Sequence, residues 1–185
     1  MLLLLLGCAH SVDITLTAAD LAPTMANGAP WDGPQGVLGV LDEKGKASLA
    51  AAFGTIVGNA AVGEAVAGVA SALQQPDAGG ELSFTSADGE PAVIAAVPIA
   101  SDSLAPRWVP GSATLKGVSL RPGSKLRVLL VDKDIDSDDP IGSVVLSAGQ
   151  LAAALGTDGA FTVDTARQSS GQLLSVSVLV VPAAK

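Results

Sequence analysis

Apolar and polar residues alternate along two stretches, one near each end of the chain. Residues 12–18 and 174–180 place their apolar side chains on one face, which is the pattern of a half-buried strand. Between these stretches lie six shorter apolar runs, separated by Gly, Pro, Asp and Ser turns: Leu82 to Thr85, Ala92 to Val97, Thr114 to Ser119, Leu126 to Val131, Ser143 to Leu146 and Phe161 to Asp164. Eight short strands at this spacing predict an all-β fold, an eight-stranded antiparallel β-sandwich over residues 12–181.

One short helix is expected among the strands. Ser147 and Gln150 have the spacing of a capping box, the run Leu151 to Leu155 follows, and Gly156 supplies a stop.

Residues 33–75 form an Ala/Gly-rich insert that interrupts the strand pattern. From Ala47 to Leu73 the only charged residue is Glu64, and the composition favours helix over strand. Three interpretations stay open: a helical hairpin or bent helix packed on the sandwich, an element that inserts into a membrane, or a disordered linker.

Composition narrows the possible functions. The chain has no Tyr, three Phe and two Trp, so its core must be aliphatic. The net charge is −8, and 14 of the 18 acidic residues are Asp, which favours loops and ligand turns. Because no basic stripe is present to neutralise phosphates, nucleic acid is not expected as a partner. A single cysteine excludes a disulfide within the chain.

That cysteine follows a short leucine run. Leu5-Leu-Gly-Cys8 resembles the lipobox of bacterial lipoproteins, which implies lipidation of Cys8 and a signal and tether over residues 1–11. No Lys or Arg precedes the leucines, although a signal peptide requires one, and a start site placed too far downstream would account for this. The alternative is a tight N-terminal strand with a buried thiol.

Five aspartates fall within eight residues directly after the apolar run that ends at Val131: Asp132, Asp134, Asp136, Asp138 and Asp139. Residues two apart in a strand point the same way, so Asp132 and Asp134 leave the strand end on one side and repel each other. Two carboxylates about 5 Å apart cost roughly 3 kcal/mol at an effective dielectric near 20. Calcium takes about 6 to 8 oxygen ligands in a flexible arrangement, so the run predicts a calcium site. A solvated acidic turn is the alternative.

Two more aspartates belong with this run. Asp32 lies after the first predicted strand, and Asp77 lies just before the next. A sandwich gathers alternate connections at one end, so both could converge with the acidic run. Each also has a simpler explanation, since Asp32-Gly33 suits a turn and Asp77 suits a cap.

The segment Leu126 to Gly142 resembles a C2 domain, the calcium- and phospholipid-binding β-sandwich. Its strand is followed by Asp132-Lys-Asp134 and then by Asp138-Asp139-Pro-Ile-Gly142, as in that family's third ligand loop. The resemblance implies that Asp132, Asp134 and Asp139 are calcium ligands and that Asp136 and Asp138 are solvated neighbours.

The resemblance extends more loosely to other loops. Asp77 stands where the family has the Asp of its Ser-Asp-Pro-Tyr motif, although Ala78-Gly79 replaces Pro-Tyr, and Asp32 is the candidate for an earlier ligand of the same loop. Leu104-Ala-Pro-Arg-Trp108 is similar to the family's Asn-Pro-x-Trp segment, which implies that Trp108 packs against the sandwich.

Rival chemistries fit poorly. An EF-hand fails because Ser137 and Ser143 stand at its Gly and Glu positions. The Asp-x-Asp nucleophile motif of haloacid dehalogenases needs an α/β domain, which the pattern does not predict. His10 is the only histidine and lies beside the expected tether, so neither a Ser-His-Asp triad nor a zinc site is expected.

We therefore expect a protein that is not an enzyme. It would be a calcium-binding, lipid-anchored C2-like module of the bacterial cell envelope, facing away from the cytoplasm and binding membrane lipid or an envelope protein. The alternative is a structural or adhesion-type envelope lipoprotein in which calcium only rigidifies the loops or is absent.

Overall fold

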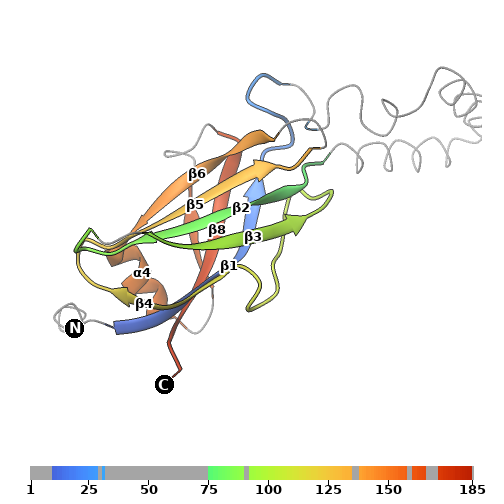
Figure 1. Ribbon diagram of the computed structural model, residues 1–185. Helices are drawn as coiled ribbons and strands as arrows, with labels where there is room; N and C mark the ends of the chain where they lie inside the picture. Colours follow the sequence, from blue (N-terminus) through green and yellow to red (C-terminus); the bar gives the residue numbers. More distant parts are fainter. Residues whose placement is uncertain are drawn as a thin grey trace, which may run out of the picture.

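A computed structural model describes residues 10–28, 31, 75–89, 92–134, 138–157, 160–165 and 171–184. These residues form eight strands and one helix, drawn in Figure 1: β1 His10–Leu21, β2 Ala78–Thr85, β3 Val93–Ala100, β4 Thr114–Leu120, β5 Lys125–Asp132, β6 Asp139–Ser147, α4 Ala148–Leu155, β7 Phe161–Asp164 and β8 Leu173–Pro182. All eight predicted strands are present, so the all-β prediction is confirmed.

The strands form two four-stranded sheets, with the orders β4-β1-β8-β7 and β3-β2-β5-β6. Every pairing in both sheets is antiparallel. Successive connections therefore alternate between the two ends of the sandwich. Residues 22–77, 101–113, 133–138 and 165–172 connect strands at one end, whereas β1 begins and β8 finishes at the other, shown at the lower left of Figure 1.

Most strands are longer than the hydrophobic pattern predicts. β6 begins at Asp139 instead of Ser143, because Asp139 pairs with Asp132 and Pro140 pairs with Val131. Polar residues and proline can pair at a strand end without burying apolar surface, so alternation alone misses them. The predicted helix is confirmed, with Ser147 as N-cap and the complete capping box.

The core is mostly aliphatic, in line with the composition, and Phe84 and both tryptophans are buried in it. Trp31 is 1% exposed and donates its indole N–H to the carbonyl of Ala22 at 2.9 Å. Trp108 is 6% exposed and donates to the carbonyl of Pro98 at 2.7 Å. The expected packing of Trp108 is therefore present. The hydrogen bond from its indole to Pro98 links the β3–β4 connection to β3.

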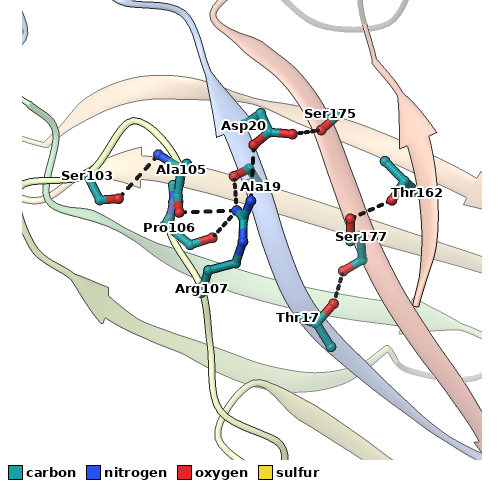
Figure 2. Close-up of polar contacts among 10 residues, drawn as sticks. All are labelled: Thr17, Ala19, Asp20, Ser103, Ala105, Pro106, Arg107, Thr162, Ser175 and Ser177. Carbon is teal, nitrogen blue, oxygen red and sulfur yellow. Dashed lines mark hydrogen bonds and ion pairs between the residues drawn. The ribbon is translucent and has the colours of Figure 1, made fainter. Parts of the chain in front are cut away.

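Hydrogen bonds from Arg107 hold the same connection against β1 (Figure 2). The guanidinium of Arg107 donates from Nη1 to three carbonyls, those of Ala19, Ala105 and Pro106, at 2.9 to 3.1 Å. Its Nη2 lies 3.5 Å from a carboxylate oxygen of Asp20, whose other oxygen accepts a bond from Ser175 on β8. The connection from 101 to 113 is thus tied to both sheets before it reaches β4.

Some predictions fall on residues outside the described ranges. They concern Cys8, Asp32, Asp136 and almost all of the 33–75 insert. Within the described ranges, no helix combines the length and hydropathy needed to cross a membrane.

Candidate functional site

One end of the sandwich carries aspartates from three connections. We call this the acidic end and define it by Asp77, Asp102, Asp132, Asp134, Asp138 and Asp139. Alternation of the connections brings the starts of β2 and β6 together with the ends of β3 and β5. The predicted convergence of the acidic run with Asp77 therefore follows from the sheet topology.

Asp132 lies at the centre of this end and is fully buried. It is the last residue of β5, and its Oδ1 accepts the backbone N–H of Asp77 at 2.7 Å. The carbonyl of Asp77 in turn accepts the backbone N–H of Lys133 at 3.0 Å. These two bonds join the β1–β2 connection to the β5–β6 connection, although 55 residues separate Asp77 from Asp132.

The β3–β4 connection joins the same arrangement through Asp102. The backbone N–H of Asp102 donates to Oδ1 of Asp77 at 2.9 Å, and Asp102 adopts a left-handed φ of 50°. Beside it, the N–H of Ser103 donates to the carbonyl of Pro76 at 3.1 Å. The sequence analysis did not single out Asp102. Its place a few residues after the predicted strand Ala92 to Val97 was the available signal.

The remaining aspartates differ in their surroundings. Asp139 is half-buried and pairs with Asp132 across the β5–β6 ladder, whereas Asp134 lies beyond the strand and is exposed. Asp138 was expected to be a solvated neighbour, but its carboxylate forms an ion pair with the ammonium of Lys133. One positive charge of the chain itself therefore lies within the acidic end.

The stem of Lys133 is positioned by a glycine. A methyl group added at Gly79 would lie 3.2 Å from Cγ1 of Ile99 and 3.3 Å from Cγ of Lys133. A side chain at position 79 would therefore require Ile99 or the lysine stem to shift by a few tenths of an ångström. The sequence Asp77-Ala-Gly79, which departs from the C2 motif, thus leaves room for the lysine that pairs with Asp138.

The carboxylates supply the oxygen donors that calcium prefers, and the buried Asp132 accepts a hydrogen bond from the β1–β2 connection. Among the described residues, however, no group of three or more His, Cys, Asp or Glu side chains is placed to hold one metal ion. The donor chemistry fits calcium, but the described side chains are not grouped around one point. The assignment of Asp132, Asp134, Asp139, Asp77 and Asp32 as ligands stays a prediction.

Comparisons with known proteins give only structural likeness. No family model matches the sequence, and no curated protein matches it. A C2 domain of plant extended synaptotagmin 1 is 16% identical with a TM-score of 0.42, covering 95% of this chain and 97% of that one. Human GIVD cytosolic phospholipase A2 is 12% identical with a TM-score of 0.45, covering 95% of this chain but 18% of that one.

A calcium-bound structure of two C2 domains of extended synaptotagmin 2 is 16% identical with a TM-score of 0.41, covering 92% of this chain and 45% of that one. The synaptotagmin matches are C2 domains, the family that the sequence resembles. The likeness is one of fold alone at these identities, and the site is described only by its own contacts.

Proposed function

We propose that the acidic end is a calcium-dependent, non-catalytic binding surface for anionic groups of a membrane lipid or a protein partner. The observation that carries this proposal is the bond from the Asp77 N–H to the buried carboxylate of Asp132, which unites two distant connections. A buried carboxylate beside further carboxylates is stabilised when a cation joins it. Calcium binding at the acidic end would therefore be electrostatically favourable.

Three residues would hold the ion, namely Asp132, Asp134 and Asp139, and Asp77 would support them from the neighbouring connection. When bound, calcium supplies the positive charge that an anionic headgroup or carboxylate can join. The chain's own contribution includes Lys133, whose ammonium pairs with Asp138 beside these carboxylates. This ammonium would lie at the rim of the site, where it could also bind an anion.

The test is a calorimetric calcium titration of the wild type and of the double variant Asp132→Asn/Asp134→Asn. Asparagine keeps the oxygen that accepts the Asp77 N–H, so the variant should fold while losing two negative charges. We expect calcium binding in the wild type and its loss in the double variant. Asp88→Asn is the matched control, because Asp88 is an exposed acid that pairs with Arg121 at the other end of the sandwich. Equal calcium binding by all three proteins, or by none, would reject the site.

Vesicle flotation then separates the partners. Calcium-dependent flotation with phosphatidylserine vesicles, lost in the double variant, supports lipid as the target. Calcium binding without flotation supports a protein partner.

A second candidate is a structural or adhesion-type module that works without calcium. The ion pair between Lys133 and Asp138 favours it, because the lysine already neutralises part of the acidic end. The same titration distinguishes the two candidates, since this one predicts no heat of calcium binding. It also predicts that calcium leaves the melting temperature unchanged.

We also propose that Cys8 carries a lipid anchor and that the protein is extracytoplasmic. β1 begins at His10, so an anchor at Cys8 would hold the start of β1 close to the bilayer. β1 has 12 residues and spans about 40 Å, which puts the acidic end far from that bilayer surface. This geometry favours a partner or an opposed membrane over the anchoring membrane. Loss of the lipid by Cys8→Ser, measured by mass spectrometry and membrane fractionation, tests the anchor.

A further inference from the structure

Strand β3 forms one edge of its sheet and lacks the charges that usually protect an edge. The sheet order places it outside β2. No charged residue occurs from Pro91 to Ser101, and Ile94 and Ile99 are 59% and 56% exposed. Natural proteins commonly protect such edges with lysine, bulges or covering loops, because an open edge can pair with another strand.

The bond from Trp108 shows which backbone groups face the open side. It reaches the carbonyl of Pro98, so that carbonyl points away from β2. In an antiparallel strand the N–H and C=O of one residue point to the same side, and alternate residues share a side. The register with β2 shifts between Val97 and Ala100, so the side of Ile94 and Ala96 follows instead from their partners on β2. The Asp77 carbonyl accepts the Lys133 N–H, and alternation along β2 then turns Glu81 and Ser83 toward β5. The N–H and C=O groups of Ala96 and Ile94, which lie opposite Glu81 and Ser83, therefore face outward. Among the described residues, no backbone contact from a turn or loop engages these four groups.

We propose that β3 pairs with β3 of a second copy of this chain, antiparallel and about a two-fold axis at Ala95. In this register Ile94 pairs with Ala96 of the second copy, and Ala96 with Ile94 of the second copy, which makes four hydrogen bonds. Ala95 would face Ala95 of the second copy in a non-hydrogen-bonded pair, where Cα atoms approach to about 4.5 Å and small side chains fit. Pro98 ends the pairing because it has no N–H and its carbonyl is already used.

Charge and symmetry both favour a second copy as the occupant. Each chain carries a net charge of −8, so two copies repel, and the repulsion is weakest where both contact surfaces are uncharged, as the run from Pro91 to Ser101 is. The outward N–H and C=O groups of Ile94 and Ala96 can also pair with the same groups of a second copy, as a two-fold interface requires. Val93, which is 48% exposed, would lie opposite Val97 of the second copy, at the end of the paired segment. The result is one continuous sheet of eight strands, four from each copy.

Sedimentation equilibrium of the full chain over a concentration series tests the association. We expect a monomer of 18.2 kDa in equilibrium with a dimer, strengthened by salt because salt screens the repulsion. Ala96→Pro should raise the dissociation constant at least about tenfold, since it removes two outward hydrogen bonds and no ladder bond to β2. Ile94→Lys should also raise the dissociation constant, because it places two like charges in the interface. It tests the proposal if the proline variant fails to fold.

Val145→Lys is the matched control, because Val145 is 43% exposed and lies on β6, the opposite edge of the same sheet. It should leave the dissociation constant unchanged. A chain that stays monomeric at all concentrations overturns the proposal, even if β3 then binds a strand of some other protein. So does a dimer that neither edge variant weakens.

Disulfide trapping tests the register. In a Cys8→Ser background, Ala95→Cys should form a cross-linked dimer on mild oxidation, because the facing Cα atoms fall within disulfide reach. Ala92→Cys should not, since its two copies would lie about 20 Å apart along the strands. Equal cross-linking at both positions would indicate random collision and reject the register.

Discussion

Replacement of Asp132 by alanine and by asparagine should separate a structural role of this carboxylate from a calcium-binding role. The side chain is fully buried, and its Oδ1 accepts the Asp77 N–H at 2.7 Å. A hydrogen bond to a charged group contributes about 1.5–3 kcal/mol, so without calcium we expect Asp132→Ala to lower the free energy of unfolding by about 2 kcal/mol. Asp132→Asn keeps an acceptor oxygen and should cost less than about 1 kcal/mol.

Asparagine also removes a like charge opposite Asp139 in the β5–β6 ladder, which offsets part of its cost. Urea unfolding in EDTA, followed by tryptophan fluorescence, measures both variants, because Trp31 and Trp108 are 1% and 6% exposed and report loss of the core. Equal stability of the two variants and the wild type would refute the reasoning. It would mean that the contact between Asp77 and Asp132 contributes nothing to folding.

Addition of calcium then tests the second role. A ligand that binds only the folded state stabilises it by about 2.7 kcal/mol at a concentration of 100 times its Kd. The wild type should gain this stability, and Asp132→Asn should not, although the two proteins differ little in EDTA. Calcium stabilisation of equal size in both would remove Asp132 from the ligand set.

Three further changes have expected outcomes. Gly80→Ala should destabilise the fold by about 3 kcal/mol in urea unfolding, because its new methyl group would lie 2.0 Å from the carbonyl oxygen of Leu129 and its φ is 153°. Trp108→Phe should cost about 1 kcal/mol in the same assay, since it removes the bond to the Pro98 carbonyl. Lys133→Met should lower the calcium Kd in calorimetry by about three- to tenfold, because it removes a competing charge from the acidic end.

Two of these changes have a matched control. Gly149→Ala adds the same methyl group at a helical position where the nearest atom lies at 3.9 Å, and it should not destabilise the fold. Lys116→Met removes an exposed lysine on β4 and should leave calcium affinity unchanged. Equal effects of the two lysine variants would assign the change to net charge instead of to the acidic end.

The strands could be predicted because their signal is local. Alternation places Ile14 and Val178 on a buried face, and both are buried in the structure. Strand ends were less predictable, since Asp139 and Pro140 join β6 through backbone pairing with β5 and not through their hydrophobicity. An apolar pattern carries no information about that pairing.

The acidic end was predictable in place but not in detail. Antiparallel topology alone brings Asp77 to the end where β5 stops, so its proximity to Asp132 followed from the order of strands. The burial of Asp132 depends on which backbone N–H reaches it, and that N–H comes from 55 residues away. The ion pair of Lys133 with Asp138 likewise depends on how the connections pack. The sequence identifies the acidic residues of this end. Only the structure shows that the charge of Asp138 is already paired with Lys133.

The proposed dimer bears on how the acidic end could reach a membrane. Within one copy, β3 runs toward the acidic end, whereas β1 begins at the opposite end. Antiparallel pairing of the two β3 strands reverses one copy, so each end of the dimer would carry the acidic end of one copy and the β1 start of the other. A lipid at Cys8 of one copy and the acidic end of the other would then face the same surface. Anchor and acidic end lie a strand length apart in the monomer and would face one membrane only in the dimer, so Ile94→Lys should remove any strengthening by calcium of the attachment of the lipidated protein to its own vesicle, while leaving its calcium titration unchanged.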